Sequence, residues 1–375
     1  MMNFIKTYVW ILFPFIFLSG SLFLESPQKE IRHTILVSHP GEKTKISTTL
    51  VEVQNENGLP IKYYTDVESV ICLEKVCKVI PVRIIWNNLG EYQEYKLKEG
   101  EILEKYEDDF FESKDYIKLQ SILSNQASPF KEVFIEDVLT VPNENDYEEV
   151  DAISGATALE LDEKDTVPGA ALTCYTLWHW ANGNLVSVIK SITAKSASTK
   201  QLQDFLVDKN NAYYSLAIYE LKVRREYKKS IINATIDRVL QDDSLLKSTF
   251  EYINLAPSEI YFFIIKEVFF KGKKEQKLAA IKSLKYSSFK ISKTFLDNFS
   301  QELTSLKSFQ EVTALLELIQ DKNLKSVKVI ENVVPLLNRD FLIARRAYWF
   351  LKNKKLLPSQ ELLVRDFYNK NKEKL

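Results

Sequence analysis

The chain has 375 residues, 45% of them hydrophobic and 27% charged, and its formal net charge is -1. This length and composition support buried cores in two or three domains, and they exclude a disordered chain, a collagen and a polytopic membrane protein. With three cysteines and three histidines, a disulfide-built scaffold, a protein with several zinc sites and a His-rich metal centre are excluded as well.

Residues 1–25 are expected to direct export. Lys6 precedes an apolar run from 7 to 24 that contains no charge, and a polar stretch begins at Glu25. A basic start, an apolar stretch and the small residues 19–21 are typical of a secretory signal peptide. The same run is just long enough for an uncleaved membrane anchor, and a buried core helix is the third interpretation. We therefore expect a cell-envelope protein on the extracytoplasmic side, periplasmic or anchored, with no nucleic acid among its partners.

Residues 30–194 are expected to form an α+β domain. Segments rich in β-branched and aromatic residues alternate with turn formers such as Asn57-Gly58 and the stretch 87–90. The expected strands are 31–37, 48–53, 67–72, 78–86 and 91–97. The expected helices are 113–123, capped by Ser113, then 129–139 and 168–181.

Cys72 and Cys77 bracket four residues between two of the expected strands. In an exported protein, a disulfide across such a hairpin would close a small loop. Two free buried thiols are the alternative. A zinc site would need two further ligands, and none is spaced nearby.

Residues 195–375 are expected to form an all-α domain. Up to residue 194 the chain has 17 basic and 30 acidic residues, a net charge of -13, whereas the remainder has 33 and 21, a net charge of +12. Only one of the nine glycines lies after residue 183, which favours helices because glycine weakens helix interiors. The two halves of the chain are therefore built differently.

Small residues recur in this second half at intervals of 31, 32, 34 and 33 residues, at Ala217, Ser248, Ala280, Ala314 and Ala347. This spacing is typical of paired-helix solenoids, in which small residues let adjacent helices approach each other. The sequence thus predicts a HEAT-like helical-repeat domain, with an irregular helical bundle as the alternative.

One sequence motif indicates a specific chemical function. The segment Asp151-Ala152-Ile153-Ser154-Gly155-Ala156-Thr157 resembles the D-x-x-S-G-A-T motif of FMN-binding domains, which occur in the C subunit of the sodium-translocating NADH:quinone oxidoreductase and in the G subunit of the related ferredoxin-oxidising complex. The resemblance implies that a separate flavin transferase esterifies the phosphate of FMN onto Thr157. Asp151, Ser154, Gly155 and Ala156 would form the recognition context, and the two small residues leave room for phosphate near the backbone. An ordinary Ser-Gly turn is the alternative.

A second stretch, 167–180, is rich in aromatic and small residues and looks like a variant found in exported FMN-binding proteins. An aromatic ring there could stack on the isoalloxazine, and a threonine could hydrogen-bond its polar edge. The candidate cofactor-binding residues are Thr173, Tyr175, Thr176, Trp178 and His179. A core helix packed under the sheet is the alternative, in which His179 is a core or capping histidine.

The resemblance implies an exported or membrane-anchored flavoprotein that transfers electrons in the cell envelope, as a component rather than a stand-alone enzyme. Its partners would be the flavin transferase and a membrane or periplasmic redox partner. The alternative is a non-catalytic envelope scaffold whose helical repeats bind a protein. The basic runs 222–229 and 271–277 would suit an anionic membrane surface or an acidic partner, and they also suit ordinary solvated helix faces.

Overall fold

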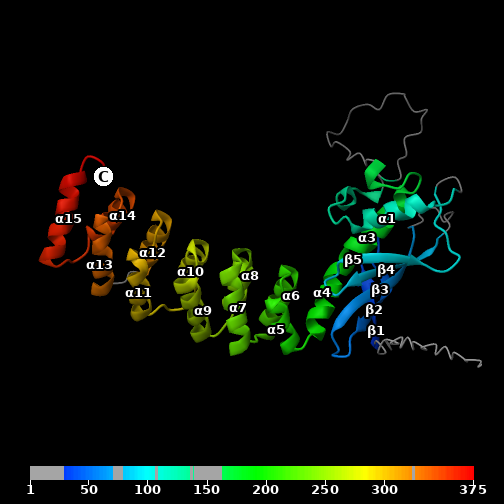
Figure 1. Cartoon of the computed structure of the whole chain (residues 1–375), viewed down its shortest axis with the longest axis horizontal. Helices are drawn as coiled ribbons and strands as arrows, with labels where there is room; N and C mark the ends of the chain where they lie inside the picture. The colour runs from blue at the N-terminus through cyan, green and yellow to red at the C-terminus, as the bar shows by residue number, and fades with distance from the viewer. Residues whose placement is uncertain (1–28, 71–78, 106–108, 136–137, 139–162, 323–325) are drawn as a thin grey trace, which may run out of the picture.

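The computed structural model describes residues 29–70, 79–105, 109–135, 138, 163–322 and 326–375. The expected export segment, Cys72 and Cys77, and the motif 151–157 lie outside these ranges. In the described residues an antiparallel sheet with its covering helices is followed by a largely helical region, which confirms the predicted fold class (Figure 1). No helix in the described part of the chain is both long and apolar enough to cross a membrane.

The sheet is a five-stranded antiparallel meander in which each strand pairs with the next along the chain. More and less buried residues alternate along much of the first and third strands, because one face of the sheet packs on helices, whereas residues 50–54 of the second strand are all buried. The strands are β1 Lys29–Val37, β2 Ile46–Gln54, β3 Pro60–Glu68, β4 Pro81–Asn87 and β5 Tyr92–Leu97.

The third strand lies earlier in the chain than expected, so the prediction of a strand over 67–72 was wrong. Gly58 adopts a φ of 71°, and the Asn55 side chain accepts hydrogen bonds from the backbone of Asn57 and Leu59, which closes a tight turn after β2. Because the turn is short, pairing resumes at Pro60. The alternation of polar and apolar residues in β3 was the missed signal.

Three helices cover one face of the sheet. α1 contacts β5, α3 contacts β4, and α4 contacts β3. The cap of α1 is Glu112 rather than the expected Ser113, and α3 begins after a turn in which Gly169 has a φ of 73°. A helix was expected over residues 129–139. The structure has a short 3-10 turn at the start of this stretch, over Pro129–Lys131. The elements are α1 Ser113–Ser124, η2 Pro129–Lys131, η3 Glu163–Asp165, α3 Ala171–Asn182 and α4 Asn184–Ser196.

Helices after α4 follow one another in a row that leads away from the sheet, with the C-terminus at the far end (Figure 1). α5 contacts α6 and α7, α6 contacts α8, α10 contacts α12, and α12 contacts α14. The helices are α5 Thr199–Val207, α6 Asn211–Arg224, α7 Lys229–Gln241, α8 Leu246–Ile253, α9 Ser258–Lys271, α10 Lys274–Tyr286, α11 Lys293–Ser300, α12 Phe309–Asp321, α13 Val327–Val333, α14 Phe341–Leu351 and α15 Pro358–Asn371, and the 3-10 turns are η4 Asp243–Leu245, η5 Gln301–Thr304 and η6 Val334–Asn338.

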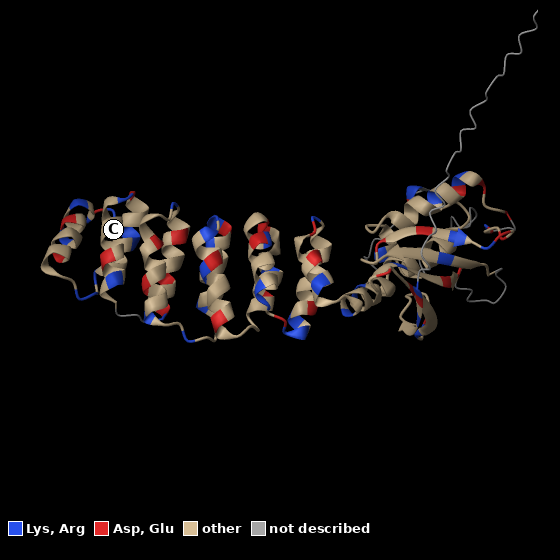
Figure 2. Cartoon of the chain, turned by 60° about the horizontal axis from the view of Figure 1, so that its bottom comes forward, with Lys and Arg blue, Asp and Glu red and all other residues tan. Residues whose placement is uncertain are grey.

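The five recurring small residues all lie on the even-numbered helices α6 to α14. Ala217, Ala280 and Ala347 are fully buried there, where neighbouring helices come close. Along this region Lys and Arg are interspersed with Asp and Glu on the same helices (Figure 2). A structural repeat with this period stays a prediction.

The end of α4 joins the two halves. Arg224 of α6 donates hydrogen bonds to the carbonyl oxygens of Ala194 and Lys195, and Tyr213 donates one to Asn88 Oδ1 at 2.7 Å. Leu89, in the β4–β5 turn, belongs to the hydrophobic core of the helical region. The predicted boundary between residues 194 and 195 therefore falls at a point where both halves are in contact.

Gly90 is expected to be the most sensitive glycine of the sheet. Its φ is 72°, and a Cβ at this position would lie 2.9 Å from the backbone oxygen of Val186 in α4. Gly90→Ala should therefore lower the free energy of unfolding by about 2–4 kcal/mol, since left-handed strain and overpacking add. Gly58→Ala is the matched control, because its φ is 71° and a Cβ there meets nothing within 4 Å. Equal losses in urea unfolding would contradict the expected clash with α4.

Candidate functional site

All five described candidate residues lie on α3, and all are buried. Thr173, Tyr175, Thr176, Trp178 and His179 are at most 9% exposed. Every residue from 173 to 181 is buried because α3 is apolar around its whole circumference and is packed between β4, α1, α4 and η2. Such burial is expected if the stretch is a core helix packed under the sheet, which was the alternative interpretation. That these side chains bind a flavin stays a prediction.

Aromatic rings gather around His179. Its ring centroid lies 4.4 Å from that of Tyr175 and 4.9 Å from that of Trp178, both in edge-to-face arrangements. Phe130 of η2 packs edge-on against Tyr175 at 5.8 Å. We call this group the α3 aromatic cluster; its members are His39, Phe130, Tyr175, Trp178, His179 and Trp180.

His39 belongs to the cluster although it lies 137 positions before Thr176 in the chain. Its Nδ1 accepts a hydrogen bond from the Gly41 backbone at 3.1 Å, so the proton sits on Nε2, which donates to the Thr176 carbonyl oxygen at 3.0 Å. Burial lowers the pKa of His39, and the bond to Thr176 opposes that shift. His39 is thus a neutral, fully bonded side chain that ties the β1–β2 connection to α3.

His179 is neutral for the same reason but is not fully bonded. Burial, and to a smaller extent the charge of a protonated His39, lower the pKa of His179 to about 4, and a hydrogen bond with the Phe130 backbone acts in the opposite direction. Its Nε2 atom is buried and has no hydrogen-bond partner among the described residues. Such an atom can accept a hydrogen bond from an N–H or O–H group, and it cannot supply a proton near neutral pH.

Cys174, on the same helix, is chemically inert. Its sulfur is buried and accepts a hydrogen bond from the Val167 backbone at 3.4 Å. Burial raises the pKa of the thiol to about 12, so the nucleophilic thiolate is not formed at neutral pH. Cys174 is therefore a buried core residue and not a reactive thiol.

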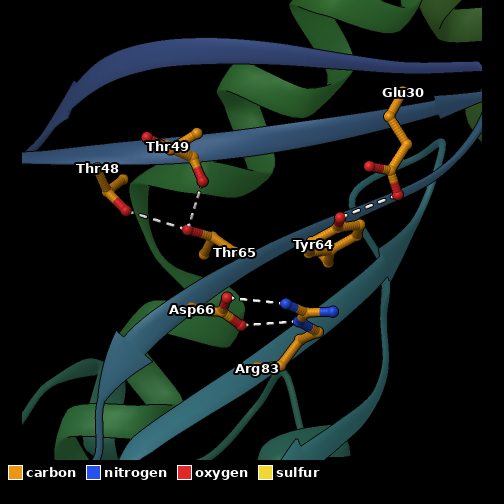
Figure 3. A network of polar contacts seen from close by, with 7 residues as sticks. All are labelled: Glu30, Thr48, Thr49, Tyr64, Thr65, Asp66 and Arg83. Carbon is orange, nitrogen blue, oxygen red and sulfur yellow. Dashed lines mark hydrogen bonds and ion pairs between the residues drawn. The ribbon is translucent and has the colours of Figure 1, made fainter.

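A second polar group lies on the open face of the sheet, where residues of β1 to β4 meet (Figure 3). Arg83 donates two hydrogen bonds to the Asp66 carboxylate, at 2.7 and 2.9 Å, and its guanidinium lies 4.3 Å from the centre of the Tyr64 ring. Tyr64 in turn donates to Glu30 at 3.0 Å. The bond from Arg83 lowers the pKa of Asp66, although both side chains are exposed and the pair adds little to stability.

This face encloses a shallow cleft of about 330 Å³ that also includes Arg32 and Thr48. Its charged groups largely satisfy one another, so the arrangement offers a polar surface rather than a reaction centre. The sequence contains no spacing that would have indicated it, because the residues come from different strands and meet only through the register of the sheet.

In the described ranges, no group of three or more His, Cys, Asp and Glu side chains comes together that could hold a metal ion.

No protein-family model, no curated protein and no solved structure matches the chain. The acceptor motif around Thr157 and the cysteine pair lie outside the described residues, so the cofactor assignment depends on the sequence motif.

Proposed function

We propose that the protein is an exported or membrane-anchored flavoprotein that carries FMN covalently on Thr157 and transfers electrons in the cell envelope. The observation that carries this proposal is the D-x-x-S-G-A-T motif at 151–157. FMN accepts one or two electrons, so a tethered flavin can pass them between a membrane donor and an extracytoplasmic acceptor. The protein would supply attachment, orientation and a partner surface.

Described residues on both sides of the motif support attachment to the sheet domain. Val138, before it, and Val167, after it, are 8% and 0% exposed and belong to the same hydrophobic core as α3. The described residues that flank the motif on either side therefore belong to the sheet domain and not to the helical region. A flavin on Thr157 would be tethered to the domain that contains the α3 aromatic cluster.

One described group fits a flavin chemically. The isoalloxazine ring carries an N–H donor, and His179 Nε2 is a buried neutral acceptor without a partner among the described residues. Because its pKa is lowered to about 4, the imidazole stays an acceptor throughout the neutral range. In this proposal His179 Nε2 would accept a hydrogen bond from that N–H group and so orient the ring.

Covalent attachment is tested by expressing the full chain with and without a flavin transferase. With the enzyme, the denatured protein should show flavin fluorescence that migrates with its band, and the peptide that contains Thr157 should gain the mass of FMN less water. Thr157→Ala should abolish both signals completely, since no other hydroxyl occupies the acceptor position.

Thr166→Ala, which removes a nearby threonine outside the motif, is the matched control and should retain the flavin. If neither signal forms while the same transferase modifies a known substrate, the proposal is wrong. Loss of flavin in Thr166→Ala as well would point to misfolding rather than to loss of the acceptor.

A second candidate function, a scaffold that binds a protein partner through its helical region, is favoured by a surface groove of about 540 Å³ between α8 and α10, whose lining includes Phe250 and Tyr286. The colour of the protein purified from its own host distinguishes the two candidates, because only the loaded flavoprotein is yellow.

A further inference from the structure

A groove opens between α8 and α10 on the surface of the helical region. It encloses about 540 Å³. Its walls are mainly apolar and aromatic, with Leu246 and Phe250 on the side of α8 and Ala279, Tyr286 and Phe289 on the side of α10. A cavity of this size accommodates a few side chains of a bound segment.

The groove exists because the facing side of α10 carries small side chains. Ala279 and Ser283 are one turn apart and leave space opposite Leu246 and Phe250, which are one turn apart on α8. The Ser283 hydroxyl is hydrogen-bonded to Tyr261 of α9 at 2.8 Å. α8 has only eight residues, so the groove is about 12 Å long, a length that suits two or three anchoring side chains.

Aromatic side chains of the groove are only partly covered by the protein. Tyr286 is 75% exposed, and Leu255 is 54% exposed at the end of α8 next to the groove residue Asn254. Phe250 and Phe289 are half-buried against the core of the helical region. Exposed aromatic and aliphatic surface of this kind is typical of the centre of a protein interface.

Positive charge lies on both walls. Lys247 on α8 and Lys282 on α10 are exposed, and neither forms an ion pair with a described residue. The acidic residue of the lining, Glu251, is already 3.6 Å from Lys222. An incoming carboxylate would therefore meet two lysines that have no competing partner.

The basic runs singled out in the sequence differ from this groove. Within them Arg224 is paired with Glu220, Lys271 with Glu267 and Lys277 with Glu302. Much of their charge is thus balanced by carboxylates of the same region, as the mixture of colours in Figure 2 also shows. Their paired members are less suited to an acidic partner than Lys247 and Lys282.

We propose that this groove binds an acidic amphipathic segment of a partner protein. Apolar side chains of the segment would lie between Phe250 and Tyr286, and its carboxylates would pair with Lys247 and Lys282. An amphipathic segment laid into a hydrophobic groove with charges at its edges is a common mode of peptide recognition. This interaction does not require flavin on Thr157, so it can fail or succeed independently of the proposed function.

The test uses the full chain and a random peptide library displayed on phage. We expect the enriched peptides to combine aromatic or aliphatic residues with several Asp or Glu. A fluorescein-labelled enriched peptide should bind the double variant Lys247→Glu, Lys282→Glu at least about tenfold more weakly, since two attractive charges become repulsive. Ala279→Phe, which fills the groove without changing the charge, should weaken binding as well.

The matched control is Lys266→Glu with Lys328→Glu, which makes the same change in net charge at exposed residues of α9 and α13. It should leave peptide affinity within about twofold of the wild type, apart from weak long-range effects screened by salt. Equal weakening in both double variants would show non-specific attraction and overturn the proposal.

Failure to enrich any peptide, or enrichment of peptides without acidic residues, would also overturn it. Vesicles of phosphatidylserine and phosphatidylcholine form the second arm. If they bind the wild type, lose binding to the Lys247 and Lys282 variant, and displace the peptide, the groove serves an anionic membrane rather than a protein segment.

Discussion

Replacing Trp86 with alanine is expected to lower the free energy of unfolding of the sheet domain by about 3–5 kcal/mol. Trp86 on β4 is completely buried, and its Nε1 donates a hydrogen bond of 2.7 Å to the carbonyl oxygen of Ala181. Ala181 lies in the last turn of α3, where carbonyl groups lack helical partners. The substitution would thus leave a cavity between sheet and helix together with an unsatisfied buried carbonyl.

Trp86→Phe separates the two contributions, because it keeps most of the volume and removes the hydrogen bond. It should cost about 1–3 kcal/mol, the usual penalty for an unsatisfied buried acceptor. Trp349→Ala on α14 is the matched control, since that ring is 50% exposed. In urea unfolding followed by circular dichroism, a loss for Trp86→Ala no larger than for Trp349→Ala would contradict the assigned role.

Acidification is expected to destabilise the protein between about pH 6.5 and pH 4, by roughly 3 kcal/mol from His179 alone. The pKa of this histidine is about 4 in the folded state, against an ordinary value of 6.5. Above pH 6.5 neither state binds the proton. As the pH falls from there, the unfolded chain becomes protonated first, so stability is lost until the folded pKa is passed. His39 acts in the same direction, since burial lowers its pKa too.

His179→Phe tests this expectation, because it keeps an aromatic ring in the cluster and removes the titrating group. The variant should lose most of the pH dependence between pH 6.5 and 4.5 while retaining a folded core at pH 7. Asp66 and Asp115 have lowered pKa values, and their contribution is therefore lost only at lower pH. If the variant shows the full pH dependence of the wild type, His179 is not the responsible group.

Local signals in the sequence predicted much of the fold. The expected helix over 113–123 matches α1, and the expected turns at Asn57-Gly58 and 87–90 join β2 to β3 and β4 to β5. These predictions succeeded because hydrophobic periodicity and turn formation depend on a few neighbouring residues. The third strand was misplaced for the opposite reason: its position depends on pairing with β2 and β4 as well as on its own composition.

The candidate site could be predicted only in part. The stretch rich in aromatic residues was recognised, and its aromatic residues lie on one helix. The surroundings of His179 were not recognised, since His39 and Phe130 come from distant segments. The groove between α8 and α10 was likewise invisible, because it arises where two helices fail to fill the space between them.

The sequence by itself determined the order of elements, the change from a sheet domain to a helical region near residue 195, and the expectation of a flavin at Thr157. Only the tertiary structure decided that α3 is buried on all sides, that two neutral histidines meet there, and that two lysines face an apolar groove. Periodicity and turn chemistry act over a few residues, whereas burial, pKa shifts and cavities depend on contacts between residues far apart in the chain.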